Sequence, residues 1–160
     1  MSLQICPTQL ADPGHAAAFL DLLEHYASDP MGGGSGLKPE VRASLVAELR
    51  RVPHFHGALA WRNGEAVGLI NCFAGFSTFA AKPLLNIHDI VVRREHRGTG
   101  IGQDLLAWAA GRARELGCCK LTLEVLANNQ RALAAYTRAG FAPYVLDPAA
   151  GQALFLEKRL

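Results

Sequence analysis

The chain has 160 residues, a length that favours one compact domain over residues 1–160. Half of its residues are hydrophobic, and 16 basic residues against 14 acidic ones leave a net charge of +2, which argues against intrinsic disorder and against nucleic acid as a partner. No stretch approaches the ~18 uninterrupted apolar residues of a membrane span, and the first residues lack the pattern of a signal peptide. We therefore expect a cytoplasmic protein without a membrane partner.

The N-terminal part of the chain predicts two helices before any long strand. Asp12 followed by Pro13 is typical of a helix start, because the aspartate can accept a hydrogen bond from a free backbone N–H and proline has no N–H to leave unpaired. Pro53 prevents the second helix from continuing. In chain order, we expect a strand at 3–6, a helix from 13 to near 26, a mobile glycine-rich loop at 28–36, and a helix that starts at 39 and places Val41, Leu45, Val46 and Leu49 on one apolar face.

The hydrophobic period then changes to that of strands. Asn63-Gly64 between two such runs is a strong hairpin signal, because both residues tolerate a positive φ. A strand, a helix and a strand over residues 84–126 form a crossover, which implies that the two strands pair in parallel. In chain order, we expect antiparallel strands at 54–61 and 65–73, a strand at 84–92, a helix over 101–116, a buried strand at 119–126, a helix over 129–139, and strands at 141–146 and 153–159.

Cysteine and histidine spacing shows no metal-binding pattern. The four cysteines lack the spaced pairs of a disulfide framework or a zinc site, so we interpret them as mostly buried free thiols in a reducing compartment. They are Cys6, Cys72, Cys118 and Cys119. His54 and His56 would share one face of a strand, but no third ligand follows at a suitable spacing. We predict no metal.

The segment Arg97–Gly102, R-G-T-G-I-G, stands directly between a predicted strand and a predicted helix. Alternating glycines let backbone N–H groups come close to a ligand, and a helix N-terminus adds unpaired donors and a partial positive charge. The segment therefore favours a phosphate or pyrophosphate ligand, with Arg97 as a cation beside it. Its G-x-G-x-G spacing differs from the dinucleotide fingerprint and from the P-loop. A glycine-rich helix start without any ligand is the alternative interpretation.

Two motifs in this order resemble those of the GNAT (GCN5-related) N-acetyltransferase superfamily. Val92–Gly102 is similar to its acyl-CoA-binding motif Q/R-x-x-G-x-G/A, with Arg97, Gly100 and Gly102 at the fixed positions. Asn129–Phe141 is similar to the motif N-x-x-A-x-x-x-Y-x-x-x-G-F. The resemblance implies an α/β fold in which a mixed, mostly antiparallel central sheet is flanked by helices and contains a βαβ acyl-CoA-binding core.

The resemblance also implies an acetyl-CoA-dependent N-acetyltransferase that moves the acetyl group to a primary amine of a small molecule by direct attack in a ternary complex. In the family, the backbone of the strand before the glycine motif pairs with the pantetheine arm of acetyl-CoA, and the loop amides hold its pyrophosphate. Tyr136 is implied as the general acid for the departing thiolate. The implied cofactor-binding residues are Ile90, Val91, Val92, Arg97, Gly98, Thr99, Gly100, Ile101, Gly102, Gln103, Asn129 and Tyr136.

Acetyl transfer needs a base, since an amine with a pKa of about 10.4 is almost wholly protonated at neutral pH. It also needs a donor to the oxyanion, and a backbone N–H near Ile90–Val92 is the candidate, because family members carry a bulge in this strand. His88 and Asp89 are candidate catalytic bases, and they point to opposite faces of the sheet unless a bulge intervenes. Glu124 on the neighbouring strand, or a water, is the remaining candidate.

The segment Phe73–Val92 resembles the diamine branch of the superfamily, the spermidine/spermine and thialysine acetyltransferases, which share an F-S-T-F-x-A-K-P stretch. In that branch an acidic residue precedes the strand aspartate, whereas this chain has His88 before Asp89. Two further alternatives stay open, a protein or peptide N-acetyltransferase and a non-catalytic acyl-CoA-binding module. By its position in the family, the stretch Gly32–Gly36 is a candidate lid near the acceptor. The apolar segment 153–160 is a candidate homodimer contact.

Overall fold

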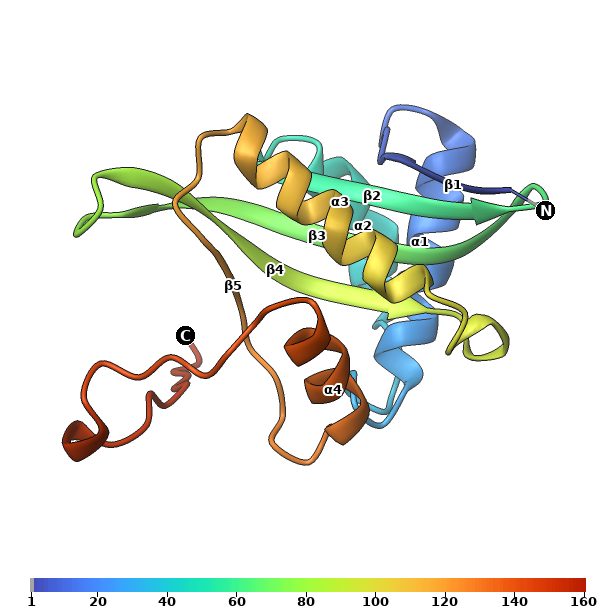
Figure 1. The fold of residues 1–160 in the computed structure, drawn as a ribbon. Helices are drawn as coiled ribbons and strands as arrows, with labels where there is room; N and C mark the ends of the chain where they lie inside the picture. Colours follow the sequence, from blue (N-terminus) through green and yellow to red (C-terminus); the bar gives the residue numbers. More distant parts are fainter. Residues whose placement is uncertain (1) are drawn as a thin grey trace. The chain divides into compact units, whose positions relative to one another are not determined.

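A computed structural model describes residues 2–160. The chain forms two compact units, residues 1–123 and 124–160, and each unit is described by itself. The expectation of one domain over residues 1–160 stays a prediction. The first unit contains β1 (Leu3–Pro7), α1 (Pro13–Ser28), α2 (Pro39–Leu49), β2 (Phe55–Arg62), β3 (Glu65–Ser77), β4 (Lys82–Val92), η1 (Arg94–His96), α3 (Ile101–Glu115) and β5 (Leu121–Leu123), and the second contains α4 (Gln130–Arg138) and η2 (Pro148–Ala150) (Figure 1).

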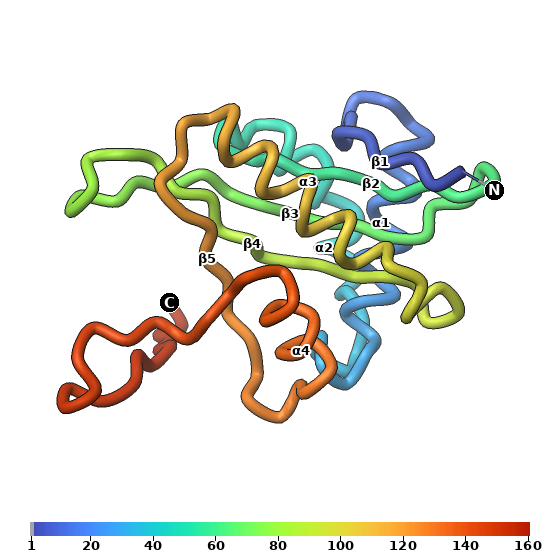
Figure 2. Tube along the Cα trace, in the orientation of Figure 1, coloured from blue at the N-terminus to red at the C-terminus, as the bar shows by residue number. Residues whose placement is uncertain are grey.

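Within residues 2–123, the strands form a five-stranded sheet in the order β1-β2-β3-β4-β5. β1 to β4 pair antiparallel with their neighbours, and β5 pairs parallel with β4, as the crossover through α3 predicted. The β2–β3 hairpin turns at Asn63 and Gly64, whose φ angles of 53° and 80° confirm the predicted turn. β3 and β4 run longer than predicted, and their hairpin extends past the other strands (Figure 2). The mixed, mostly antiparallel sheet is therefore confirmed.

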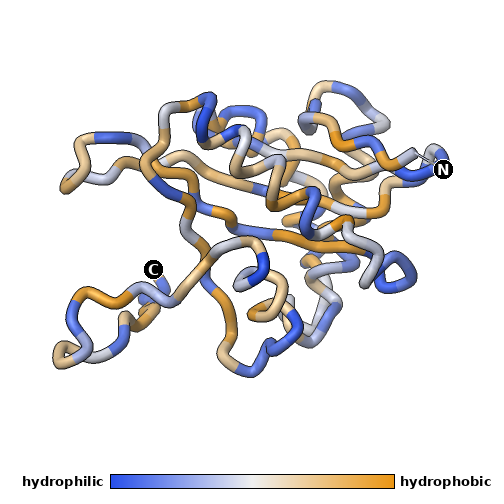
Figure 3. Tube along the Cα trace, in the orientation of Figure 1, coloured by the Kyte–Doolittle hydropathy of each residue, from blue (hydrophilic) through white to orange (hydrophobic). Residues whose placement is uncertain are grey.

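Helices cover both faces of this sheet (Figure 1). Phe19 and Leu22 of α1 are buried in one core cluster with Leu69 of β3. Gly68, the residue before Leu69, lies against Leu105 of α3. Because successive strand residues point to opposite faces, α3 covers the other side of the sheet from α1. Hydrophobic residues accordingly follow the central strands, whereas the segment after β4 is hydrophilic (Figure 3).

Both predicted helices of the N-terminal part form. The Asp12 side chain caps α1 by accepting a hydrogen bond from a first-turn backbone N–H at 2.9 Å. In α2, Leu45 and Val46 are half-buried and Leu49 is buried, but Val41 is 38% exposed. The predicted apolar face is therefore right for its last three members and wrong for Val41, because the first turn of α2 does not reach the core.

The helices after the sheet form close to their predicted positions. α3 buries Ile101, Leu105, Leu106, Ala109 and Ala113, and Gly117 with a φ of 69° follows its end. Asn129 caps α4, and Gly140 with a φ of 94° follows that helix. Among the described residues, every helix is too short or too polar to cross a lipid bilayer.

The strands after α3 differ from the predictions. Of the buried strand predicted at 119–126, only the short β5 forms, and its residues are half-buried. The strand is short because its ladder with β4 ends where Ile87 lies opposite Leu123. In the described part of the chain, no strand forms at 141–146 or 153–159. Pro143 lacks the N–H that a ladder needs, and an apolar run becomes a strand only beside a free strand edge. The candidate homodimer contact at 153–160 therefore has no strand to form it.

The four cysteines are free, as predicted, but they are not all buried. Cys72 is buried in β3, and this burial raises the pKa of its thiol to about 12. Cys6 and Cys118 are half-buried, and Cys119 is exposed because it lies in the connection between α3 and β5. The expected burial is therefore correct only for Cys72.

Ser28 ends α1, and residues 29–36 of the glycine-rich segment have no regular structure, as predicted, but their backbone is tied to the end of α1. The N–H groups of Gly32 and Gly34 both donate to the Asp29 carbonyl, at 2.8 and 3.1 Å, and the Met31 N–H donates to the Asp29 side chain at 3.0 Å. A Cβ on Gly32 would overlap the Tyr26 carbonyl oxygen, so this position accepts only glycine. The segment is a hydrogen-bonded turn rather than the loosely held loop that its composition predicts.

Candidate functional site

The glycine-rich motif joins the end of β4 to the start of α3, as predicted. Gly98 and Gly100 adopt φ angles of 78° and 94°, which residues with side chains rarely adopt. Gly100 is the N-cap of α3 without a side-chain cap, and within the described residues the N–H groups of Gly100, Ile101 and Gly102 donate no hydrogen bond. Unpaired donors at a helix N-terminus suit a phosphate oxygen, so this loop fits the pyrophosphate of acetyl-CoA.

Arg97, expected as a cation beside the pyrophosphate, makes its contacts within the protein. Its Nε donates to the Val92 carbonyl at 3.0 Å, and its Nη2 donates to Asp29 Oδ2 at 3.0 Å. The Arg97 and Asp29 side chains are only 20% and 13% exposed. The guanidinium therefore joins the glycine motif to the turn that follows α1, and it still adds a positive charge beside the loop amides.

β4 carries a bulge at the predicted base candidates. Asn71 of β3 lies opposite Asp89, whereas the next residue, Cys72, lies opposite Ile87, so His88 is an extra residue without a partner on β3. An extra residue reverses the alternation of side chains along a strand. Because of the bulge, His88 and Asp89 both lie on the sheet face that α1 and α2 cover. The sequence predicts opposite faces for these two residues unless a bulge intervenes, and the structure has this bulge.

The contacts of these two side chains agree with this placement. The His88 ring packs edge-on against Phe73 with centroids 4.8 Å apart, and Phe73 belongs to the core cluster beneath α1 and α2. Asp89 Oδ2 accepts a hydrogen bond from Asn71 Nδ2 at 3.0 Å. Burial raises the pKa of Asp89, although the Asn71 hydrogen bond and the nearby His88 act in the lowering direction. A carboxylate with a raised pKa is a stronger base than an ordinary aspartate.

The sequence reasoning missed two residues beside this carboxylate. Asn71 is only 3% exposed, and its isolated polar side chain in the apolar run of β3 was a usable signal. Tyr26 of α1 lies near both Asp89 and Asp29, and after burial these two carboxylates are the causes that raise its pKa. A tyrosine at the end of an amphipathic helix gave no signal, because only the folded chain brings it near β4.

β4 has an unpaired backbone edge beside the bulge. Ile90, Val91 and Val92 pair with β3 on one side. On the other side, β5 pairs only as far as Ile87, so within the described residues no strand pairs with the outer edge of β4 over 88–92. This is the stretch that the family resemblance assigns to the pantetheine arm, and an unpaired strand edge can bind an extended ligand through its backbone.

The second motif forms the start and body of α4 in the second unit. The Asn129 side chain accepts the Ala132 N–H at 3.2 Å and so caps the helix. Tyr136 is half-buried, and its ring lies 6.0 Å from that of Phe141. The roles of Asn129 and Tyr136 toward acetyl-CoA stay predictions. Glu124 was expected on the neighbouring strand, but β5 ends one residue earlier and Glu124 is exposed beyond it.

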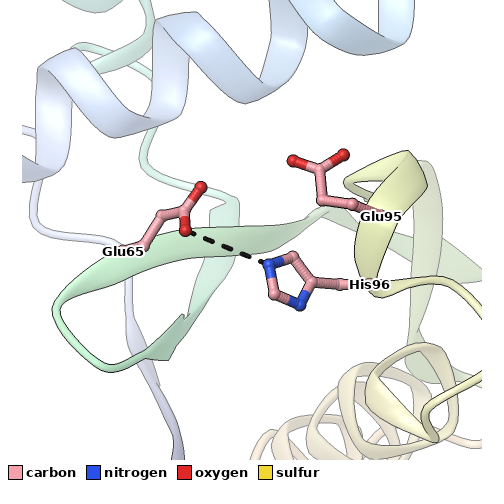
Figure 4. Close-up of side chains that lie close together, drawn as sticks. All are labelled: Glu65, Glu95 and His96. Carbon is pink, nitrogen blue, oxygen red and sulfur yellow. Dashed lines mark ion pairs between the residues drawn. The ribbon is translucent and has the colours of Figure 1, made fainter.

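Within residues 2–160, one group of side chains has the spacing to share a metal ion. Polar atoms of Glu65, Glu95 and His96 lie within 4.8 Å of one another (Figure 4). His96 Nε2 is 4.0 Å from the Glu65 carboxylate, and Arg93 Nε is 3.7 Å from the same carboxylate. Because the guanidinium already balances Glu65 and both glutamates are exposed, we interpret this group as a surface ion-pair cluster.

His54 and His56 do not share a strand face, contrary to the prediction. The His54 ring lies against Phe73, with centroids 5.9 Å apart, whereas His56 Nδ1 accepts a hydrogen bond from Arg112 of α3 at 3.4 Å. Since β2 begins at Phe55, His54 precedes the strand and does not follow its alternation.

The model of the acetyltransferase (GNAT) family matches residues 18–141 of the chain. Aminoalkylphosphonate N-acetyltransferase of Salmonella typhimurium is 37% identical over 89 residues, which are 56% of this chain and 58% of that protein. Streptothricin acetyltransferase of Streptomyces lavendulae is 46% identical over 91 residues, which are 55% of this chain and 48% of that protein. The chain thus spans about half the length of these curated relatives.

Solved structures share the fold over the whole chain. The structure of AAC(6')-Iy in complex with the bisubstrate analog CoA-S-monomethyl-acetylneamine matches with a TM-score of 0.78 over 100% of both chains, at 15% identity, which shows a likeness of fold. The family match, in contrast, covers the glycine motif, the strand bulge and the second motif. The chain therefore belongs to the acetyltransferase (GNAT) family.

Proposed function

We propose that this protein transfers the acetyl group of acetyl-CoA to a primary amine of a small molecule by direct attack in a ternary complex. The arrangement around β4 carries the proposal. Its unpaired edge and the amides that start α3 suit the cofactor, while the bulge turns His88 and Asp89 toward the face beneath α1 and α2. Cofactor and acceptor could then meet at one strand from two directions.

Acetyl-CoA supplies the thioester carbonyl that the amine attacks. Asp89 is the proposed base, because its raised pKa lets it hold a proton taken from the acceptor ammonium group. The Asn71 amide fixes one carboxylate oxygen at 3.0 Å and leaves the other for the acceptor. His88 lies beside Asp89 on the same face, where it can bind the acceptor or a water that relays the proton.

The remaining roles follow the family resemblance. A backbone N–H of Ile90–Val92, next to the bulge, would donate to the oxyanion. The Tyr136 hydroxyl would donate a proton to the departing thiolate. The N–H groups of Gly100, Ile101 and Gly102 would bind the pyrophosphate, which carries the negative charge that a helix N-terminus favours.

The acceptor is proposed to be a small molecule because the relatives reported above are named for aminoalkylphosphonates and streptothricin. The resemblance to the diamine branch, through the stretch Phe76–Pro83, makes a diamine a second acceptor to test. Thiol release from acetyl-CoA should be measured with aminoalkylphosphonates, diamines, aminoglycosides and peptides, alongside calorimetric binding of acetyl-CoA. We expect release with at least one small amine. Binding of acetyl-CoA without turnover on any acceptor would instead indicate an acyl-CoA-binding module.

A further inference from the structure

An open groove of about 790 Å³ lies between α1, α2 and the residues that follow β4. Two of these elements cover the sheet face on which Asp89 lies, so the groove is on the acceptor side of β4. Its walls carry charged side chains of both signs. They are the carboxylates of Asp21, Glu24 and Asp29 and the guanidinium groups of Arg42, Arg93 and Arg94.

The carboxylates of the groove are already paired with arginines. Arg42 contacts Asp21 at 2.8 Å and Glu24 at 3.7 Å. Arg97 contacts Asp29 at 3.0 Å. The acidic side chains therefore offer little attraction to a cationic ligand, which argues against a groove built for the second amine of a diamine.

Of the two arginines that follow β4, Arg93 is already paired. Arg93 donates its Nε to the Ala66 carbonyl at 2.9 Å and lies 3.7 Å from the exposed carboxylate of Glu65. Within residues 2–160, the exposed side chain of Arg94 makes no ion pair and no hydrogen bond. The groove thus has a guanidinium group whose donors are available to a ligand.

His25 on the α1 wall is influenced by nearby arginines. Burial lowers its pKa most, and Arg97, Arg93 and Arg94 lower it further, whereas Glu95 alone acts in the opposite direction. Its Nε2 atom is buried without a hydrogen-bond partner. The nearby cations thus add to the effect of burial on the pKa of the imidazole, and an anion in the groove would oppose their part of the effect.

Tyr26 lies near both the groove and the candidate base. Tyr26 follows His25 on α1, and its pKa is raised by both Asp89 and the groove residue Asp29 in addition to burial. One acceptor could therefore place one end in the groove and its amine near Asp89, with Tyr26 between the two ends.

We propose that this groove binds an oxyanion of the phosphate or phosphonate class on the amine acceptor, with Arg94 as the principal contact. The proposal rests on the proposed function and narrows its substrate class to amines that carry such a group. The phosphates of acetyl-CoA share this chemistry and are the second source of an oxyanion that an experiment must distinguish.

Kinetics with matched acceptors test whether the oxyanion in the groove belongs to the acceptor. The acceptors are aminoalkylphosphonates of increasing chain length and the amino alcohols with the same chains, and the proteins are the parent, Arg94→Gln and Arg50→Gln. Arg50 is exposed after α2 and outside the groove, so Arg50→Gln removes the same charge elsewhere. Arg94→Gln should raise KM for the phosphonates by about ten-fold, the size of one charge-assisted hydrogen bond, and leave KM for the amino alcohols unchanged. Equal effects on both acceptor series would overturn the proposal.

A second arm of the experiment tests whether the oxyanion in the groove is instead a phosphate of acetyl-CoA. If Arg94→Gln raises KM for acetyl-CoA but not for acetyl-dephospho-CoA, the groove binds the cofactor phosphate, and the acceptor assignment is wrong. We expect both KM values to stay as in the parent protein.

A third arm does not depend on turnover. Methylphosphonate is titrated into the protein while the imidazole signals are followed by NMR across pH, and His25→Gln identifies the His25 signal. Methylphosphonate should raise the pKa of His25 in the parent protein and in Arg50→Gln, but not in Arg94→Gln. A rise without acetyl transfer to any amine would support the groove and refute the proposed function. No rise in the parent protein would refute the groove.

Discussion

Removal of the ion pair between Arg97 and Asp29 should destabilise the first unit more than removal of an exposed pair of the same type. The two side chains are 20% and 13% exposed, their charged atoms lie 3.0 Å apart, and the contact joins the glycine motif to the turn after α1. Little solvent screens such a contact, so its charge-assisted hydrogen bond should contribute about 1.5–3 kcal/mol to the free energy of unfolding.

The pair Arg42–Asp21 is a matched control in the same molecule. Its atoms are 2.8 Å apart, but the side chains are 41% and 58% exposed. Exposed ion pairs contribute only about 0.2–1 kcal/mol, because water and salt screen them. Burial, rather than distance, should therefore decide the difference between the two pairs.

Two double-mutant cycles measure these coupling energies from urea unfolding followed by circular dichroism. One cycle uses Asp29→Ala and Arg97→Ala, the other Asp21→Ala and Arg42→Ala. Asp29→Ala also removes the hydrogen bond that the Asp29 side chain accepts from the Met31 N–H. This loss occurs both when Arg97 is present and when it is replaced by alanine, so it cancels in the first cycle. A coupling energy for Arg97–Asp29 that is no larger than that of the control pair would refute the reasoning.

Three further predictions concern the turn, the base and the general acid. Gly32→Ala should lower the free energy of unfolding in the same urea assay, because the new Cβ would overlap a backbone carbonyl. Gly111→Ala in α3, where the new Cβ meets open space, should be neutral or stabilising. Equal effects of the two substitutions would contradict the packing of the turn. Asp89 must be deprotonated to act as a base, so kcat/KM should fall as the pH falls through its raised pKa. The residual activity of Asp89→Asn should not show this fall at acidic pH. If the fall persists in the variant, Asp89 is not the base. Tyr136→Phe should lower kcat by about ten-fold or more with little change in the calorimetric Kd of acetyl-CoA, and an unchanged kcat would contradict its role as the acid.

The cofactor side of the site could be predicted from the sequence because it is local. Positive φ angles at Gly98 and Gly100, and a helix that starts directly after them, depend on consecutive residues. The hairpin at Asn63-Gly64 is local in the same sense. Such features follow from the conformational freedom of glycine and from the N–H groups that every helix start leaves unpaired.

The acceptor side could not be predicted in the same way because it depends on pairing across the sheet. The bulge at His88 appears only when β3 is placed beside β4 and Cys72 lies opposite Ile87. Alternation alone would have separated His88 from Asp89. The strands predicted at 141–146 and 153–159 failed for a related reason, since apolar composition does not supply a partner edge.

Contacts across long sequence separations also decided which charges are available. Arg97 looked like a free cation beside a phosphate, but Asp29, far away in the sequence, accepts its hydrogen bond. Arg94, which stands three residues earlier and is of the same type, has no such partner within the described residues. Only the folded chain distinguishes the two arginines.

The central claim is direct transfer of an acetyl group from acetyl-CoA to a small amine. The most direct measurement is mass spectrometry of amine and protein after incubation with acetyl-CoA that carries an isotopically labelled acetyl group. We predict that the label appears on the nitrogen of the amine, in an amount equal to the thiol released, while the protein stays unlabelled. Label that remains on the cofactor, or that accumulates covalently on the protein, would contradict the account.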